Sequence, residues 1–245
     1  MFKSKKREKI REDHLNANND NLVVYKAPQH PIAEVYRTLR TNIQFTTFDR
    51  ALKTLSVTSA TEGEGKTTTL SNLAVTFAQQ SNRVLVIDAD LRRPKVHKIF
   101  NLENRQGLTE VLVNQADSKE LIHSTFVENL FVLPTGVIPP NPSELLGSRR
   151  MKDFLALVEK DFDYVLIDTP PVNMVTDGLL IANIVDGLLL VCSSGVVPTE
   201  EAQRAKELLT QAKANILGVV LNNVPFDSSK YYYYQNDDIE KAPSA

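Results

Sequence analysis

The 245-residue chain has one cysteine, no tryptophan and almost no net charge, with a formal charge of -2 at pH 7. A single cysteine excludes an internal disulfide and fits a reducing cellular interior. Cys192 lies in the apolar run of residues 188–192, which favours a buried thiol in a strand. A charge near zero provides no general attraction to nucleic acid, so we expect no nucleic-acid partner.

The chain also lacks a long apolar run. Its longest weakly charged stretch, residues 178–197, holds Asn183 and Asp186 near the centre. A charged side chain at the centre of a membrane span costs about 2.5–3.5 kcal/mol. The N-terminus is basic, but no apolar segment of a secretory signal follows it. We therefore expect a cytoplasmic protein that does not cross a membrane.

The composition is that of a folded protein, with 42% hydrophobic and 24% charged residues. The length suits one large domain. We expect a disordered, basic and polar tail at residues 1–28, one domain at residues 29–225, and a flexible tail at residues 226–245. The N-terminal tail either touches an anionic membrane weakly or is simply solvated.

The central part alternates continuous apolar runs with segments of helical periodicity. We expect strands at residues 55–58, 83–88, 130–133, 164–168, 188–192 and 216–221. We expect helices at residues 31–45, 66–80, 108–113, 118–123, 149–160, 178–183 and 199–213. Apolar strands separated by helices are typical of a parallel sheet buried on both faces. The predicted fold class is therefore α/β, with a mostly parallel sheet and helices on both sides.

A phosphate-binding loop follows the first expected strand. The pattern G-x-x-x-x-G-K-[ST] between a strand and a helix binds nucleotide phosphates, and here only its first glycine is replaced, by Ala60. Backbone N–H groups and the helix N-terminus would face the phosphates. Lys66 would reach the β- and γ-phosphates, and the Thr67 hydroxyl would bind Mg²⁺. The expected nucleotide-binding residues of this P-loop NTPase-like site are Thr61, Glu62, Gly63, Glu64, Gly65, Lys66, Thr67 and Thr68.

Three aspartates follow two other buried strands. Asp88 and Asp90 end one strand, and Asp168 ends another. The carboxyl ends of parallel strands meet at one edge of the sheet, so these side chains should converge on the phosphate loop. Mg²⁺ binds few protein ligands and keeps several waters. We expect Thr67 to be its direct ligand, with Asp88, Asp90 and Asp168 acting mainly through water.

Asn222 ends the last expected strand at the same edge. Its amide has both a donor and an acceptor, which suits the exposed edge of adenine. The alternative interpretation is an asparagine that forms a turn. The sequence alone leaves both possibilities open.

Four consecutive tyrosines, Tyr231, Tyr232, Tyr233 and Tyr234, lie in the polar C-terminal tail. A tail that serves only solubility has no need for four adjacent phenols, whereas a phosphoryl acceptor does. From Asn222 to Tyr231 the chain can span at most about 30 Å. The tail can therefore reach its own phosphate site or that of a neighbour.

Taken together, these motifs resemble those of the bacterial tyrosine kinase family, the cytoplasmic autokinases of capsule and exopolysaccharide assembly. The resemblance runs from about Pro31 to the tyrosine cluster. It rests on the phosphate loop (Walker A), Asp88-x-Asp90-x-Arg92 (Walker A′), residues 165–168 (Walker B), residues 139–146, Glu34-x-x-Arg37-x-x-Arg40 and the terminal tyrosines.

The resemblance implies a role for each matching residue. Lys66 would stabilise the transferred phosphoryl group, Asp90 would accept the proton of the acceptor phenol, and Arg92 would stabilise developing negative charge. ATP and Mg²⁺ are the implied cofactors. The activity implied is that of an ATP-dependent protein-tyrosine kinase that phosphorylates its own tyrosine cluster, in trans, and regulates polysaccharide synthesis and export.

Glu34, Arg37 and Arg40 have two interpretations. An intrahelical Glu34–Arg37 pair would be worth only about 0.2–0.5 kcal/mol. The resemblance instead implies an interface that closes subunits into a ring, possibly an octamer.

The resemblance also implies partners typical of the Gram-positive branch. These are a separate transmembrane activator that recruits the kinase to the inner face of the membrane, a cognate tyrosine phosphatase, and further protein substrates. The alternative function is a nucleotide-switched assembly factor of the partition-ATPase type. Such proteins carry a signature lysine where this chain has Thr61.

Overall fold

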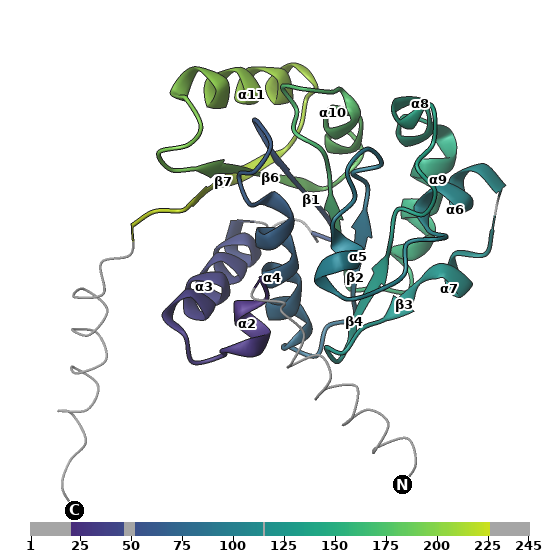
Figure 1. Cartoon of the computed structure of the whole chain (residues 1–245), viewed down its shortest axis with the longest axis horizontal. Coiled ribbons are helices and arrows are strands. Elements are labelled where there is room, and N and C mark those ends of the chain that lie inside the picture. The colour runs from purple at the N-terminus through teal and green to yellow at the C-terminus, as the bar shows by residue number, and fades with distance from the viewer. Residues whose placement is uncertain (1–20, 47–51, 115, 226–245) are drawn as a thin grey trace, which may run out of the picture.

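The computed structural model describes residues 21–46, 52–114 and 116–225. Its centre is a seven-stranded sheet in the order β3-β4-β2-β5-β1-β6-β7 (Figure 1). The strands are β1 (Thr54–Ser59), β2 (Val84–Asp88), β3 (His123–Ser124), β4 (Leu130–Leu133), β5 (Tyr164–Asp168), β6 (Gly187–Ser193) and β7 (Ile216–Asn222). All neighbours pair in parallel except β3 and β4, which are antiparallel. The prediction of a mostly parallel α/β sheet is confirmed.

Helices cover both faces of this sheet (Figure 1). Those that pack on the first face are α2 (Val23–Lys26), α3 (Pro31–Thr46), α4 (Lys66–Ala78) and α5 (Val96–Ile99). Those on the second face or beside it are α6 (Leu108–Asn114), α7 (Ser118–Leu121), α8 (Pro142–Leu146), α9 (Arg149–Val158), α10 (Asp177–Ala182) and α11 (Thr199–Gln211).

The strand side chains alternate between the two faces, so each face has its own core. In β2, Val84 and Val86 pack with α4 and α5, whereas Leu85 and Ile87 pack with α6 and α9. Strands β1 and β2 are buried on both faces. Strand β2 is accordingly apolar as far as Asp88, whereas β1 includes the buried polar residues Thr54, Ser56 and Thr58. Helix α4 is buried almost all round because α2 and α3 lie between it and the solvent. Burial of α4 holds the phosphate loop at its N-terminus against a rigid support.

The predicted disordered tail at residues 1–28 is wrong for its last part. Residues 22–26 are ordered, and Leu22 and Val24 are completely buried against α4. The Asn72 side chain of α4 accepts a hydrogen bond from Val24 N (3.0 Å) and donates one to Asn21 O (2.6 Å). The run of residues 22–25 is too short to show a periodicity in the sequence. It is stabilised by Asn72, which lies 48 positions away from Val24. Residues 1–20 lie outside the described residues.

Helix α3 forms as predicted, but the expected apolar stripe is only partly buried. Ala33 and Ile43 are buried, whereas Ile32 and Val35 are 40% and 50% exposed. The residue range 118–123 is also not one helix: α7 ends at Leu121, and His123 begins β3, pairing with Val132. Short helices α5 and α8 were not predicted at all, because each has only four or five residues.

The parallel strands point their carboxyl ends to one edge of the sheet. Asp88 and Asp168 are direct neighbours in the register of β2 and β5, and β1 leads into the phosphate loop beside them. Along the described part of the chain, no helix combines the length and apolarity needed to cross a bilayer.

Candidate functional site

The phosphate loop turns sharply between β1 and α4. Gly63 and Gly65 both have left-handed backbones, with φ of +82° and +89°. A side chain at Gly65 would also collide with Asn222, since a Cβ there would lie 2.1 Å from Nδ2. Ala60, which replaces the first glycine of the pattern, is buried and is not among the residues with positive φ. The loop therefore keeps its shape without the first glycine.

Lys66 lies at the centre of the site, at the start of α4. Its Nζ is 3.0 Å from Asp90 Oδ2 and 3.5 Å from both oxygens of Asp168. The Thr67 hydroxyl donates to Asp168 Oδ2 at 2.7 Å. The lysine and both carboxylates are at least nine-tenths buried. The structure thus brings together four of the residues predicted from Walker A, Walker A′ and Walker B.

Three carboxylates surround one ammonium group, and this imbalance shifts the pKa values. Burial raises the pKa of Asp88, assisted by the charge of Asp168, to about 8. Burial also raises the pKa of Asp168, although Lys66 and the Thr67 hydroxyl oppose it. For Lys66 burial lowers the pKa, but Asp168 and Asp90 outweigh it, so the pKa of Lys66 is raised. The site has an excess of negative charge that favours binding a cation.

Asp88 shows where such a cation would fit. Its Oδ2 accepts hydrogen bonds from Lys95 N (3.1 Å) and Val96 N (3.0 Å), which caps α5. Its Oδ1 is completely buried and has no hydrogen-bond partner. A buried carboxylate oxygen without a donor is costly unless a cation or water satisfies it.

No group of three or more His, Cys, Asp or Glu side chains in the described ranges is arranged to hold a metal by itself. This fits Mg²⁺, which usually binds one or two carboxylates together with water and substrate phosphates. Such a partial site needs oxygen ligands for the metal. The Thr67 hydroxyl beside Asp168 is one, and the Asp88 oxygen that has no hydrogen-bond partner among the described residues is another.

The Glu64 side chain holds the phosphate loop in place, and the predicted contact of Glu64 with the nucleotide remains untested. Its buried carboxylate accepts hydrogen bonds from the backbone of Thr61 (2.5 Å) and from Ser193 N at the end of β6 (3.1 Å). The side chain therefore points away from the phosphate path and holds the loop against the sheet. Only the Glu64 backbone remains available to a phosphate.

Asn222 also holds the loop. Its Nδ2 donates to Glu64 O at 3.0 Å, across 158 positions of sequence. The next residue, Asn223, donates from its side chain to Ser193 Oγ at 2.7 Å. The predicted contact with adenine remains untested; Asn222 Oδ1 and the second N–H of its amide are the groups that could make it.

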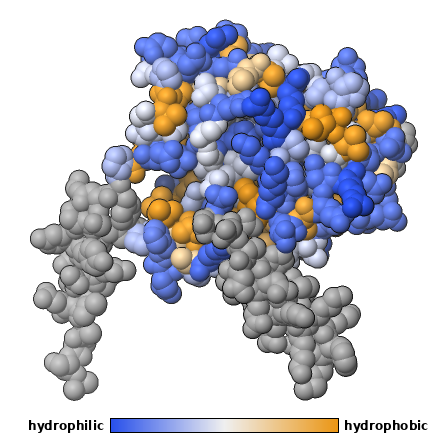
Figure 2. Space-filling view, viewed as in Figure 1, coloured by the Kyte–Doolittle hydropathy of each residue, from blue (hydrophilic) through white to orange (hydrophobic). Residues whose placement is uncertain are grey.

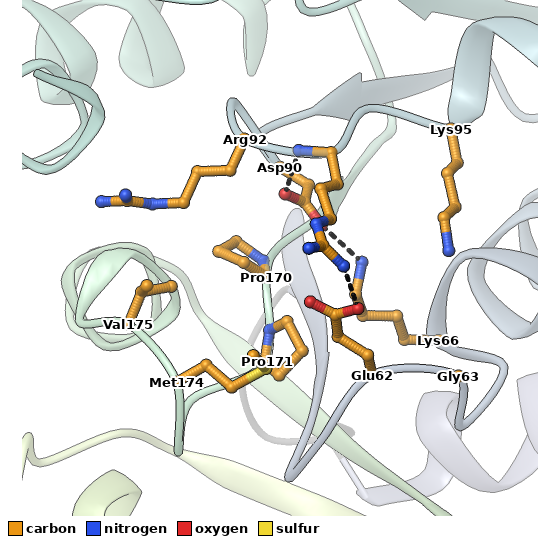
Figure 3. A pocket seen from close by; sticks show the side chains of 11 residues that line it. Glu62, Gly63, Lys66, Asp90, Arg92, Lys95, Pro170, Pro171, Met174 and Val175 are labelled. Atoms are coloured by element: carbon orange, nitrogen blue, oxygen red, sulfur yellow. Dashed lines mark hydrogen bonds and ion pairs between the residues drawn. The ribbon is translucent and has the colours of Figure 1, made fainter. Parts of the chain in front are cut away.

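Arg92 lies beside the site but is turned away from its centre (Figure 3). Its guanidinium donates to both oxygens of Asp177, at 2.8 and 3.2 Å, and Ser143 donates to the same carboxylate at 2.6 Å. Asp177 is completely buried. The predicted role of Arg92 in stabilising charge is untested, and this geometry instead has it joining the Walker A′ loop to α8 and α10.

A pocket of about 210 Å³ opens next to Lys66 and Asp90. Besides these two, it is lined by Glu62, Gly63, Arg92, Arg93, Lys95, Pro170, Pro171, Met174 and Val175 (Figure 3). Sequence reasoning missed Arg93, Lys95 and the apolar residues of this pocket. The one available signal in the sequence was the pair of adjacent basic residues, Arg92 and Arg93, shortly after Asp90.

The predicted interface residues of α3 make contacts within the chain. Arg37 pairs with Glu34 at 2.7 Å, as expected for i,i+3 neighbours. Arg40 donates to Thr76 O of α4 at 2.8 Å. The intrahelical pair is therefore confirmed, whereas the ring interface remains untested. Tyr231, Tyr232, Tyr233 and Tyr234 lie outside the described residues.

Comparisons relate this chain to known proteins. A family model described as an AAA domain matches residues 52–216. The chain is 43% identical over 230 residues to tyrosine-protein kinase YwqD of Bacillus subtilis (strain 168), covering 94% of this chain and 97% of that protein. It is 40% identical over 218 residues to the putative tyrosine-protein kinase CapB of Staphylococcus aureus, covering 89% and 96%.

Among solved structures, the chimerical protein CapA2B2 superposes with a TM-score of 0.81 at 41% identity, covering 84% of this chain and 91% of that one. The family model spans the phosphate loop and all three aspartates, and it ends before Asn222.

Proposed function

We propose how this chain, which belongs to the family of bacterial tyrosine-protein kinases, carries out its reaction: it transfers the γ-phosphoryl group of ATP to the tyrosines of its own C-terminal cluster. Its similarity to tyrosine-protein kinases over most of its length identifies the chain as a tyrosine-protein kinase. The acceptor tyrosines and the role of each residue are what we propose. The observation that carries it is the buried contact of Lys66 with Asp90 and Asp168 beneath a glycine-rich loop.

Lys66 neutralises charge during the transfer. Its ammonium compensates two carboxylates, those of Asp90 and Asp168. A bound triphosphate competes for the same ammonium, and the developing charge on the transferred group makes that contact stronger in the transition state. Movement of Lys66 toward phosphate releases Asp90 Oδ2 from its ion pair.

Asp90 then acts as the base. An ordinary tyrosine hydroxyl has a pKa near 10 and stays protonated at neutral pH. The phenol oxygen forms a bond to the γ-phosphorus while the bond from this phosphorus to the β,γ-bridging oxygen breaks. The phenol proton passes to Asp90 and ADP leaves. Asp90 is held for this task by the backbone of Arg93, which donates to its other oxygen at 3.0 Å.

Thr67, Asp88 and Asp168 would hold Mg²⁺, which supplies charge neutralisation of the phosphates when bound. The unpartnered Asp88 oxygen supports this assignment.

The position at which the tail begins is compatible with transfer between subunits, which the family resemblance favours over transfer within one subunit. It follows β7, whose end is tied to the phosphate loop through Asn222, so it starts at the same edge of the sheet as the site. Glu34, Arg37 and Arg40 would form the interface of a ring, possibly an octamer, in which each tail enters the site of a neighbour. Phosphorylation would add several negative charges to the tail and open the ring.

In the cell, we propose recruitment to the inner membrane face by a transmembrane activator and control of capsular or exopolysaccharide synthesis and export. A cognate phosphatase would reverse the modification. The resemblance to this family supports these assignments.

The decisive experiment mixes two chains. An inactive Lys66→Met chain that keeps the tail is incubated with an active chain truncated after residue 225, ATP and Mg²⁺. We expect phosphate on Tyr231–Tyr234 of the inactive chain by mass spectrometry. If the inactive chain stays unlabelled, while a full-length active chain incubated by itself becomes labelled, trans transfer is contradicted. Phosphate release without any phosphotyrosine would contradict the kinase and favour the assembly-factor alternative.

A further inference from the structure

The pocket beside Asp90 and Lys66 has two unlike walls (Figure 3). Pro171, Met174 and Val175 form an apolar side, and Lys95 lies on the opposite side of Lys66. The volume of about 210 Å³ is below the roughly 300–1,000 Å³ of most small-molecule sites. The pocket therefore suits one aromatic side chain better than a whole ligand. Met174 is 57% exposed, so an incoming ring would bury apolar surface that is now in water.

Two of the four cations around this pocket already have buried partners. Lys66 contacts Asp90 and Asp168. Arg92 binds both oxygens of Asp177, which is completely buried. Lys66 is directed to the phosphate in the proposed reaction, and withdrawal of Arg92 would leave the buried Asp177 carboxylate unpaired, so neither cation is available to an acceptor carboxylate.

Arg93 and Lys95 are the cations that remain available. Arg93 pairs with Glu62, but their side chains are 68% and 41% exposed, and exposed ion pairs are easily exchanged. Within the described residues, the exposed Lys95 ammonium has neither an ion pair nor a hydrogen bond. Its backbone N–H donates to Asp88, which fixes the base of the side chain next to the site. The pocket thus carries a basic rim suited to a carboxylate partner.

We propose that this pocket is the acceptor subsite, and that it selects tyrosines followed by acidic residues. The phenol ring packs on Pro171, Met174 and Val175 with its hydroxyl toward Asp90. Arg93 and Lys95 pair with carboxylates located C-terminal to the tyrosine, and the acceptor carboxylate replaces Glu62 on Arg93. This inference rests on the proposed function, because it specifies the substrate class of the same site.

The sequence of the tail offers the complementary charge. Asp237, Asp238 and Glu240 follow Tyr234 by three, four and six positions. Three residues of extended chain span about 10 Å, so such carboxylates lie beyond the reacting phenol but within reach of long basic side chains at the pocket rim.

A charge-exchange experiment tests this recognition. The acceptor is a full-length Lys66→Met chain, with either the natural tail or a tail carrying Asp237→Lys, Asp238→Lys and Glu240→Lys. The enzyme is the full-length chain, unchanged or with Arg93→Glu and Lys95→Glu, distinguished from the acceptor by mass. A Lys98→Glu enzyme is the matched control, since Lys98 is exposed on α5, three residues after Lys95, but does not line the pocket. Free peptides of residues 229–242 with both tail sequences repeat the test without contributions from assembly.

We expect the reversed tail to lower kcat/KM for the acceptor about tenfold with the unchanged enzyme. The Arg93→Glu, Lys95→Glu enzyme should reverse this preference, and Lys98→Glu should leave it unaltered. Equal phosphorylation of both tails would overturn the recognition while leaving the kinase proposal intact. A raised KM for ATP with no dependence on tail charge would also overturn it, since the rim would then serve the nucleotide. No phosphotyrosine on any acceptor would instead overturn the proposed function.

Discussion

The two halves of the carboxyl edge of the sheet differ in chemistry. At β2, β5 and the phosphate loop, three buried carboxylates surround Lys66. At β6 and β7, the edge carries Ser193, Asn222 and Asn223, which are uncharged. In the proposed reaction the charged half contains the groups that act on phosphate, whereas the neutral half holds the loop in position. Substitutions in the charged half should therefore lower kcat, and substitutions in the neutral half should weaken ATP binding.

The largest effect is expected from Lys66→Met in the charged half. Loss of the Lys66 ammonium, which lies among three carboxylates, removes stabilisation of the transferred phosphoryl group, and we expect a fall in kcat of about 10³-fold or more. The measurement is the rate of phosphotyrosine formation at saturating ATP. Lys152→Met, at an exposed position of α9, is the control and should keep its activity. Comparable activity in the two variants would show that the charged half is not the reaction centre.

Asp90→Asn should come next, with a fall in kcat of about 10²-fold because the amide cannot accept the phenol proton. ATP affinity, measured by calorimetry, should change less than threefold. Asp153→Asn, an exposed aspartate of α9, provides the matched control. If Asp90→Asn weakened ATP binding and left kcat unaltered, Asp90 would serve nucleotide binding rather than proton transfer.

Asn222→Ala tests the neutral half. It removes the 3.0 Å hydrogen bond to Glu64 O and should weaken ATP binding about five- to tenfold, in keeping with one lost hydrogen bond of about 1–1.5 kcal/mol. We expect kcat at saturating ATP to fall less than threefold. Asn215→Ala, just before the opposite end of β7, loses a bond to Asp186 O and should not alter ATP affinity. A large loss of kcat in Asn222→Ala would remove the functional distinction between the halves.

Asp88→Asn should raise stability in the absence of divalent cations. The pKa of Asp88 is raised to about 8 in the folded chain, so the folded state binds the proton more tightly than the unfolded state does. The protonated Asp88 side chain therefore contributes to the stability of the folded state. This contribution is fully present below about pH 4 and is lost as the pH rises to about 8. Thermal unfolding in EDTA should show Asp88→Asn gaining at least about 3 °C over the unchanged chain at pH 8, and less at pH 6. A gain independent of pH would contradict the assignment to Asp88 ionisation.

The smallest effect on stability is expected far from both halves. Arg37→Ala breaks an exposed pair with Glu34 that is worth about 0.2–0.5 kcal/mol, so the melting temperature of the monomer should fall by less than about 2 °C.

Light scattering of the Arg37→Ala, Arg40→Ala double variant tests the proposed ring. Persistence of the ring would refute the interface without affecting the comparison of the two halves.

The parallel core of the fold and the charged half were predictable from sequence for a clear physical reason. Strands buried on both faces are mostly apolar, although β1 includes Thr54, Ser56 and Thr58. Aspartates at or just after the ends of such parallel strands lie at the shared carboxyl edge. Lys66, Thr67 and Asp168 accordingly meet as expected.

The neutral half was not predictable in the same way. The partners of Glu64 and Asn222 come from residues 129 and 158 positions away, and no local pattern reports such contacts. The same holds for Arg92, where the motif gives the position of the residue but not the direction of its side chain. Its partner Asp177 lies in a segment that resembles an ordinary helix start. The local sequence of residues 22–26 is typical of a tail, because their hydrogen-bond partner, Asn72 in α4, lies 48 positions after Val24.

The attachment of the end of β7 has a mechanical consequence. A pulling force applied beyond residue 225 enters the domain at Asn223 and Asn222, whose side chains are bonded to Ser193 Oγ and Glu64 O. These bonds bear the load before the interior of the sheet does, and one of them ends on the phosphate loop. Tension on the C-terminal segment would therefore act on nucleotide affinity while the core remains folded, and optical-trap measurements of ATP dwell times under load would detect it.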